Sequence, residues 1–531
     1  MSSKAISLEA VKCLKVDLEK LKPQHDTPIG LIHPYWARKP LNIVDNIINR
    51  LSNKNDIVFD PFSGSGTIPF SALSNQRNAL ASDLNPLSIF ITQNVLELGT
   101  FDNKELEFIR IFFTKLAEQY SDWFLFNNEM IERVRYEVSG EYKDGNFTLL
   151  PVEVVTKKQT RSGWRGRNVQ VVKALEKKSV MQKYRYTPID FRKLALPENS
   201  RIAIPKGAVL SHFFDELNIA VINFLFGQIR DVKPMKVRNA LLFILSSALP
   251  LLRISDKKAT SQWPYWRPKA NVTSRNPLFI LDKRVESFCD GVIWARNKTY
   301  GSERVAIAEV CKKQKPAKYS VFRSAAQQIQ SKGVESGSID LILTDPPYAD
   351  QAPYLEYSEL WNNILFSKSG SLHYAHEIVK TDARLRKKDN SEYINRLTSA
   401  LAVCCDCLKP GGFFAFFYQD RNLMHWAGIS KTLADSNMAV VEVLSLPKQR
   451  RSLKTVTSPG RTLDGDLLVV ARKGPSKNST KVSTKEIILP KTKKTLFDQY
   501  SFLIREGLMN ESMDLLLAKD SDVFSLIEKL N

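Results

Sequence analysis

Two stretches of the chain alternate between short apolar runs and apolar residues at helical spacing. In the first, residues 31–100, strands are predicted over 56–60 and 78–83, with an amphipathic helix before and after each. The second stretch, residues 319–473, contains further strand-like runs, namely YSVFRS, SIDLILTD, GGFFAFFYQD, VVEVLSL and DLLVVARK. Because strands and helices alternate in this way, the sequence predicts an α/β fold with a parallel, doubly wound sheet.

Residues 101–318 interrupt this alternation. They begin with a long amphipathic helix, continue with alternating β-type runs over 131–190, and end with apolar helices and a loop-like segment. A connection of roughly 220 residues is far longer than the loops that join ordinary elements. We therefore expect one α/β domain, split into 31–100 and 319–473, that encloses an α+β insertion with a role of its own.

The remaining segments are short. The sequence predicts a polar N-terminal lead-in with a short helix over residues 1–30 and a linker over 474–490. It predicts a helical C-terminal appendage over 491–531. The N-terminus has no apolar signal-peptide core, and no run of 18 or more apolar residues occurs. These features predict a soluble, cytoplasmic protein with no membrane partner.

The charge balance is strongly basic, with 77 Lys and Arg against 56 Asp and Glu and a formal net charge of +21. Such an excess favours a polyanionic partner, because each phosphate that is neutralised releases counterions. A basic protein with no nucleic-acid role is the alternative. The six cysteines show no disulfide framework, and Cys404, Cys405 and Cys407 lack a second ligand pair at zinc-ribbon spacing. We expect reduced core cysteines and no bound metal.

A glycine-rich turn, Asp60–Thr67 (DPFSGSGT), follows the first predicted strand. Two glycines two residues apart let the backbone turn tightly and approach a ligand closely. The turn lies at the carboxyl end of a parallel strand, where open α/β sheets bind ligands. Asp83 ends the next strand, 23 residues after Asp60, as a ribose-binding acid does. The turn lacks the Gly-Lys-Ser/Thr of a P-loop, and a simple tight turn is the alternative.

A second motif, Asp345-Pro346-Pro347-Tyr348, follows another apolar strand. The exocyclic amine of a base is a poor nucleophile, because its lone pair is delocalised into the ring. Hydrogen bonds from its two hydrogens to the Asp345 carboxylate and the Pro346 carbonyl favour a pyramidal nitrogen with a free lone pair. The two prolines fix the backbone, and Tyr348 can stack on a base flipped out of a duplex. A proline-rich turn without chemistry is the alternative.

Taken together, DPFSGSGT, SDLNP and DPPY resemble the motifs of the amino-methyltransferases of nucleic acids. The segment His33–Pro40 (HPYWARKP) resembles the His-Pro-x-x-Lys-Pro element that precedes the glycine-rich motif in many bacterial DNA adenine and cytosine-amino methyltransferases. Its longer form, and Tyr354-x-Glu356-x-Ser358, resemble most a bacterial group of adenine-specific DNA methylases. The resemblance covers residues 31–100 and 319–473.

The resemblance implies a Rossmann-like catalytic domain, S-adenosyl-L-methionine as the methyl donor and double-stranded DNA as the substrate. Its catalytic residues are Asp345, Pro346, Pro347 and Tyr348. The implied cofactor contacts come from the upstream motifs and one later strand end: His33, Lys39, Pro40, Asp60, Pro61, Phe62, Ser63, Gly64, Ser65, Gly66, Thr67, Asp83, Asn85 and Ser324. Related sequences frequently carry a cysteine-rich zinc ribbon in the insertion, but residues 101–318 contain only Cys289 and Cys311, so no zinc is expected.

The motif order implies that the insertion recognises the target. Candidate DNA contacts are basic residues in the insertion and on loops of the α/β domain, with one Trp among them: Lys157, Lys158, Arg161, Trp164, Arg165, Arg167, Arg267, Arg384, Arg386, Lys387, Lys388, Arg450 and Arg451. A solvated basic hairpin tip is the alternative interpretation of KKQTRSGWRGR. Trp263, Tyr265 and Trp266 are candidates to gate a flipped-base pocket, with ordinary packing as the alternative.

Transfer to N6 of adenine is preferred over N4 of cytosine, because Asp as the first residue of the DPPY-type motif is commoner among adenine enzymes in this resemblance. An RNA amino-methyltransferase and a catalytically silent DNA-binding protein stay open as alternatives. The chain shows no nuclease constellation, so any restriction activity has to come from a separate restriction or defence-system protein.

Overall fold

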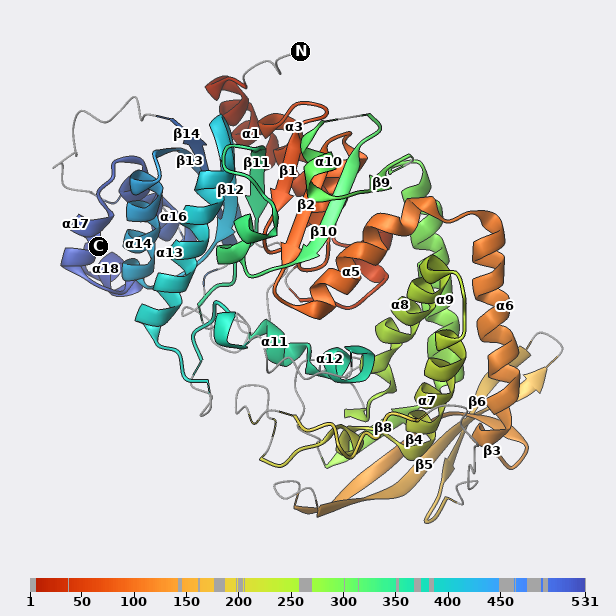
Figure 1. Ribbon diagram of the computed structural model, residues 1–531. Helices are drawn as coiled ribbons and strands as arrows, with labels where there is room; N and C mark the ends of the chain where they lie inside the picture. The colour runs from red at the N-terminus through yellow and green to blue at the C-terminus, as the bar shows by residue number, and fades with distance from the viewer. Residues whose placement is uncertain are drawn as a thin grey trace.

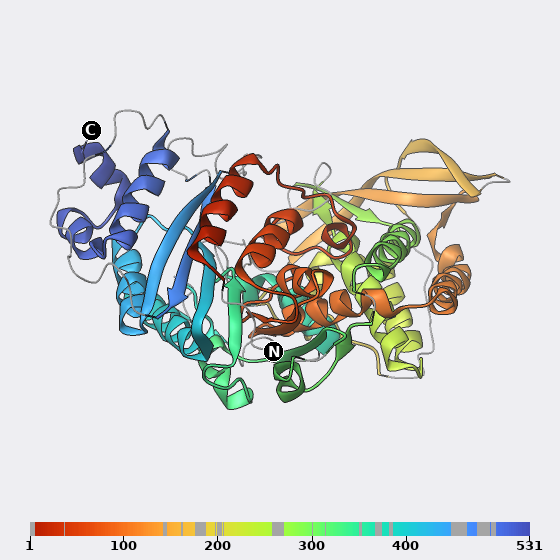
Figure 2. The same ribbon diagram turned by 90° about the horizontal axis from the view of Figure 1, so that it is seen from above.

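The structure is a computed structural model with two β-sheets, joined and covered by helices (Figure 1). It describes the following residues: 6–36, 38–141, 146–160, 163–175, 187–196, 198, 204, 206–256, 270–299, 301–313, 315–349, 353–366, 374–381, 386–447, 463, 465–474, 489 and 495–530. Figure 2 shows the long β-hairpins of the second sheet at one end of the molecule and the C-terminal helices at the other.

The first sheet has eight strands in the order β13-β14-β12-β11-β1-β2-β10-β9. Its strands are β1 (Ile57–Asp60), β2 (Asn78–Asp83), β9 (Glu303–Arg304), β10 (Lys318–Arg323), β11 (Ile339–Thr344), β12 (Leu408–Tyr418), β13 (Met438–Pro447) and β14 (Gly465–Lys473). The predicted strands of both stretches are therefore confirmed, and so is the α/β class. The sheet is mixed rather than wholly parallel, because β14 runs antiparallel to both of its neighbours. No helix of the described residues separates β13 from β14, and strands joined without a crossover helix pair antiparallel.

Helices cover both faces of this sheet because successive strand residues point to opposite sides. In β1, Val58 belongs to one hydrophobic core and Phe59 to the other. The core that contains Val58 also holds α1 (Leu8–Lys20), α3 (Leu41–Leu51), α4 (Thr67–Ser74) and α5 (Pro86–Glu97). The core that contains Phe59 holds α10 (Ile307–Cys311), α13 (Asn390–Cys407), α14 (Leu423–Asp435), α16 (Leu496–Met509), α17 (Met513–Lys519) and α18 (Val523–Leu530). The predicted helical appendage thus packs into the second core.

The second sheet lies within the predicted insertion. Its strand order is β6-β5-β4-β8-β7, with β3 paired to β4. The strands are β3 (Leu125–Phe126), β4 (Glu129–Glu141), β5 (Asn146–Thr160), β6 (Gly163–Val171), β7 (Ser255–Asp256) and β8 (Asn271–Arg275), and the helices are α6 (Asn103–Tyr120), α7 (Glu216–Arg230), α8 (Met235–Leu252) and α9 (Pro277–Arg296). Residues 101–318 thus contain both strands and helices, although β9 near their end belongs to the first sheet.

The two parts share one hydrophobic core. Residues of α8 and α9 belong to the same cluster as Val58 of β1, and α8 contacts α5. Two short helices, α11 (Tyr354–Tyr357) and α12 (Glu359–Phe366), lie between the first sheet and the helices of the insertion (Figure 1). Since the packing is continuous, the domain boundaries expected near residues 100 and 318 stay a prediction.

Helix α8 is, among the residues that the structure describes, the one helix long and apolar enough to cross a membrane. Its 18-residue window is 67% buried inside the protein. Burial of this kind is typical of the core helix of a folded domain.

Candidate active site

The glycine-rich turn connects β1 directly to α4. Gly64 and Gly66 have φ angles of +50° and +78°, in the left-handed region that favours glycine. A Cβ on Gly64 would lie 3.0 Å from Cε1 of Tyr35, and a Cβ on Gly66 would lie 3.0 Å from Cα of Thr92. Both glycines are therefore required by backbone conformation and by the close approach of protein atoms, and the predicted tight turn is confirmed.

Hydrogen bonds to Asp83 connect this turn to the end of the neighbouring strand β2. Its carboxylate accepts hydrogen bonds from the backbone N–H of Gly64 (2.9 Å) and of Asn85 (2.9 Å). Asn85 caps α5 by accepting from the Leu87 N–H, and its side-chain amide donates to the Ser358 hydroxyl at 2.6 Å. Ser358 belongs to the second segment that the resemblance singled out.

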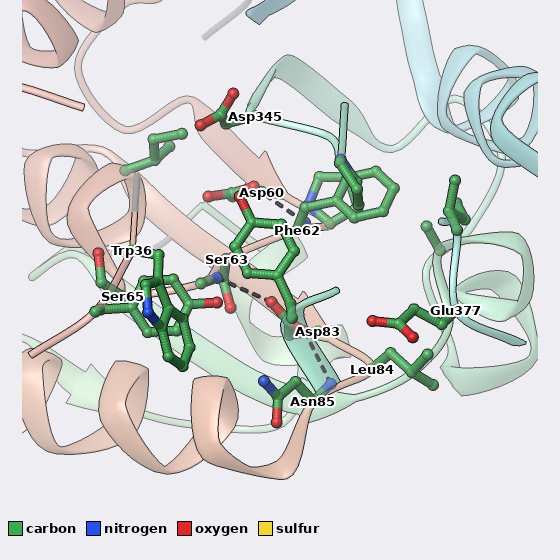
Figure 3. Close-up of a pocket in the computed structure, with 18 of the residues that line it drawn as sticks. Trp36, Asp60, Phe62, Ser63, Ser65, Asp83, Leu84, Asn85, Asp345 and Glu377 are labelled. Atoms are coloured by element: carbon green, nitrogen blue, oxygen red, sulfur yellow. Dashed lines mark hydrogen bonds between the residues drawn. The ribbon is translucent and has the colours of Figure 1, made fainter. Parts of the chain in front are cut away.

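A pocket lies at the carboxyl ends of β1, β2 and β11, where these motifs meet (Figure 3). The sequence-predicted residues that line it are Lys39, Asp60, Pro61, Phe62, Ser63, Gly64, Ser65, Thr67, Asp83, Asn85, Asp345 and Pro347. Further lining residues are Tyr35, Trp36, Arg38, Ile68, Leu84, Ala325, Ala326, Gln327, Tyr354, Leu355, His376, Glu377 and Ile378. Of these, Glu377 is a buried acid that belongs to no motif of the sequence.

The other predicted cofactor residues are not among those that line the pocket. His33 is buried against the insertion, where its Nε2 lies 3.0 Å from the Ser246 hydroxyl of α8, and burial lowers its pKa to about 3. Pro40 and Gly66 precede α3 and α4 as their N-cap residues. Ser324 donates its N–H to the Asp83 carbonyl, and so joins the ends of β10 and β2.

The pocket is lined by acids whose proton affinity is raised. Asp60 is buried and accepts hydrogen bonds from the Thr344 hydroxyl (2.6 Å) and the Phe62 N–H (3.1 Å), yet burial raises its pKa to about 8. Burial also raises the pKa of Asp83 to about 6, and it raises the pKa of Glu377. A ligand that brings positive charge or hydroxyl donors would lower these pKa values, because it stabilises the ionised carboxylates.

We predict that Asp60→Asn stabilises the protein more as the pH rises. The pKa of Asp60 is about 8 in the folded protein and ~3.9 in an unfolded chain. The folded state thus retains a proton that the unfolded state releases, so the free energy of unfolding of the wild type falls between these two pH values, by at most ~1.4 kcal/mol per pH unit. Asparagine removes this loss while keeping an oxygen for Thr344. Urea unfolding at pH 5 and pH 8 measures the difference, and a variant effect that is equal at both pH values contradicts the prediction.

The Asp-Pro-Pro-Tyr segment begins directly after β11. The Tyr348 hydroxyl donates to Oδ1 of Asp345 at 2.7 Å. The Tyr348 ring packs edge-on against Tyr418, with ring centroids 5.6 Å apart. The Tyr393 hydroxyl donates to the Pro347 carbonyl at 2.7 Å, and Pro346 is buried. The side chain of Asp345 faces the pocket near Asp60 (Figure 3).

The basic residues of the insertion that were predicted to contact DNA differ in their surroundings. Lys157 and Arg167 form ion pairs with Glu132, and Lys158 forms one with Glu129. Arg165 is exposed on β6, and Trp164 is partly buried against the core.

Three consecutive basic residues of the α/β part differ in burial. Arg386 forms an ion pair with the buried Glu356 at 2.5 Å and lies over the Tyr374 ring. Lys387 is exposed. Lys388 is buried and donates to the backbone carbonyl of Tyr374. The candidates that lie outside the described residues are Arg161, Trp263, Tyr265, Trp266, Arg267, Arg384, Arg450 and Arg451.

We predict that substitution of two neighbouring basic residues affects stability to very different extents. Arg386→Ala removes the cation that pairs with the buried Glu356, so the free energy of unfolding should fall by about 3 kcal/mol. Lys387→Ala removes an equal charge from an exposed position, so it should change stability by no more than about 0.5 kcal/mol. Urea unfolding of both variants measures this, and equal losses contradict the structural role of Arg386.

The three clustered cysteines are not among the residues that line the pocket. Cys404, Cys405 and Cys407 are buried free thiols, and burial raises the pKa of Cys405 and of Cys407 to about 12 each. Within the described ranges, no group of three or more His, Cys, Asp or Glu side chains is placed to hold a metal ion.

The fold and the site together define a class: an α/β protein whose acidic pocket joins a glycine-rich turn to an Asp-Pro-Pro-Tyr segment at neighbouring strand ends. Residues 12–94 match a family model described as DNA methylase. The Type II methyltransferase M.MjaII of Methanocaldococcus jannaschii is 22% identical over 356 residues, which make up 64% of this chain and 62% of that protein. The match therefore covers less than two thirds of the relative's length. Together the two matches support the DNA amino-methyltransferase family for this chain, at low identity.

Proposed function

We propose that this protein is an S-adenosylmethionine-dependent DNA methyltransferase with a Rossmann-like catalytic core, which transfers a methyl group to N6 of a flipped-out adenine. One observation carries the proposal. The Thr344 hydroxyl donates to Asp60 at 2.6 Å, so the residue directly before Asp345 is joined to the first residue of the glycine-rich turn. A ligand in this turn and a base at Asp345 then share one pocket.

The pocket residues fit S-adenosylmethionine. The cofactor supplies a methyl group bonded to a positively charged sulfur, which is a strong electrophile. The Asp83 carboxylate can accept the ribose hydroxyls, as an acid at the end of the second strand does in nucleotide-binding sheets. A cationic ligand would stabilise the ionised forms of the acids at positions 60, 83 and 377, and the left-handed backbone at Gly64 leaves room where a side chain would meet Tyr35.

The chain's own residues then orient the acceptor. Asp345 and the Pro346 carbonyl accept the two amine hydrogens of the target base, which directs the nitrogen lone pair toward the cofactor pocket. Tyr348 offers a ring for the flipped base, and its position is supported by the edge-on contact with Tyr418. Because the methyl donor is already activated, alignment of the two reactants accounts for most of the catalysis.

The substrate is proposed to be double-stranded DNA, bound in part by the insertion. Arg165 on β6 and Lys387 in the α/β part are exposed and suit phosphate contacts. A cytoplasmic location and a separate restriction or defence-system partner stay predictions.

The test is methyl transfer from tritiated S-adenosylmethionine to unmethylated DNA and to RNA, followed by mass spectrometry of the nucleosides. N6-methyladenine in DNA supports the proposal. Label only in methylcytosine changes the target base, and label in RNA but not in DNA overturns the substrate. Tight DNA binding without cofactor binding in calorimetry leaves a catalytically silent DNA-binding protein.

A further inference from the structure

Lys39, which the resemblance assigned to the cofactor, directly contacts the Asp-Pro-Pro-Tyr segment. Its Nζ is 3.2 Å from Oδ2 of Asp345 and 3.0 Å from the Tyr348 hydroxyl. It is also 2.8 Å from Oδ2 of Asp466. Three distant parts of the chain therefore meet around one ammonium group.

Asp466 reaches this cluster because β14 runs antiparallel to both of its neighbours. It is the second residue of β14, and the next residue, Leu467, pairs with Tyr418 at the end of β12. The reversed direction of β14 brings its first residues to the same edge as the carboxyl ends of the parallel strands. No sequence motif contains Asp466.

The cluster is shielded from water, which strengthens its electrostatics. The side chains of Lys39, Asp345 and Asp466 are 11%, 18% and 14% exposed. The Lys39 ammonium also lies 4.9 Å from the centroid of the Phe417 ring. The two carboxylates raise the pKa of Lys39 despite its burial, so this residue stays a cation.

We propose that Lys39, anchored by Asp466, is a positioning residue that keeps the Asp345 carboxylate ionised and oriented toward the pocket. The inference rests on the proposed function, because the ionised carboxylate is what accepts a hydrogen from the target amine. It assigns Lys39 to the acceptor side of the reaction instead of the cofactor side.

The charges around Asp345 make the proposal specific. The groups that interact electrostatically with it are Lys39, Asp466, Asp60 and the hydroxyls of Tyr348 and Tyr354. Burial and Asp466 raise the pKa of Asp345, and Lys39 lowers it. Without Lys39, two carboxylates share a site with no ammonium between them, and one of them takes up a proton. Without Asp466, the pKa of Asp345 falls, because the repelling carboxylate is gone and the Lys39 ammonium remains.

The experiment is the pH profile of methyl transfer for Lys39→Gln and Asp466→Asn, beside the wild type. In Lys39→Gln, the acid limb of the profile should shift to higher pH by about one unit or more, and the rate should partly recover at high pH. In Asp466→Asn, the acid limb should not move up. Cofactor affinity, measured by calorimetry, should stay within about threefold of the wild type in both variants. An unshifted profile, or a loss of cofactor binding in Lys39→Gln, overturns the proposal.

Lys313 provides a matched control, because its ammonium also lies between two carboxylates, Asp56 at 3.1 Å and Asp340 at 2.8 Å. These residues lie at the opposite ends of β1 and β11 from the pocket, so Lys313→Gln should leave the pH profile unchanged. If the wild type methylates neither DNA nor RNA, the proposed function fails on that result alone. The Lys39–Asp345 coupling is then measured by urea unfolding of Lys39→Gln, Asp345→Asn and the double variant, where additive effects overturn it.

Discussion

Asp345→Ala is expected to reduce methyl transfer by about 100-fold or more while leaving cofactor binding nearly intact. In the proposed mechanism the carboxylate accepts a hydrogen from the target amine, and alanine offers no replacement. The residue is held by the Tyr348 hydroxyl and the Lys39 ammonium, and neither contact supports the glycine-rich turn that holds the cofactor in our proposal. Rates with saturating cofactor, beside calorimetry of cofactor binding, measure the two effects separately.

Tyr348→Phe serves as the control for this variant. It removes the hydroxyl that donates to Asp345 but keeps the ring that packs against Tyr418. We expect a smaller loss of rate than in Asp345→Ala, because the carboxylate itself remains. Methylation by Asp345→Ala at a rate near that of the wild type would contradict the role of the segment.

Gly64→Ala is expected to weaken cofactor binding by about tenfold or more, which corresponds to about 1.4 kcal/mol. The φ angle of Gly64 is +50°, and an L-residue in this region costs about 1–2 kcal/mol. The new Cβ would also lie 3.0 Å from the Tyr35 ring. That ring cannot retreat easily, because its hydroxyl bonds to Ser88 at 2.9 Å and its face stacks with Tyr354.

Gly337→Ala is a control that separates the effect of the contact with Tyr35 from the effect of backbone strain. Gly337 has a similar φ angle of +63°, but nothing lies within 4 Å of an added Cβ. This variant should lose some stability and keep its cofactor affinity. Calorimetry of both variants measures the difference, and equal affinities in the two would show that the approach of Tyr35 to the turn has no part in cofactor binding.

The net charge of the chain is a poor guide to which surface is free for the proposed contacts with DNA. Glu132 pairs with Lys157 and Arg167, and Glu129 pairs with Lys158, so three of the basic residues in the predicted patch are already partnered by acids from β4. Arg386 is used inside the fold by Glu356. The excess of positive charge remains, but its distribution depends on contacts between strands.

Much of the site could be predicted from the sequence, because turns and strand ends are determined by neighbouring residues. The glycine pair predicted a tight turn after β1, and both glycines have the positive φ angles that such a turn favours. The apolar runs predicted the strands, whose parallel pairing brings Asp60, Asp83 and Asp345 to one edge. Periodicity and turn chemistry act over a few residues, so they can be recognised without the fold.

Other features depend on the fold as a whole. His33, predicted to border the cofactor, is packed against α8 of the insertion, and Lys39 contacts Asp345 and Asp466. Glu377 enters the pocket from a segment with no motif. Local sequence was therefore sufficient to predict the α/β elements, the glycine-rich turn and the Asp-Pro-Pro-Tyr strand end. The charge partners of those residues needed the fold, because the field at a buried group sums over side chains that are distant in sequence and adjacent only in space.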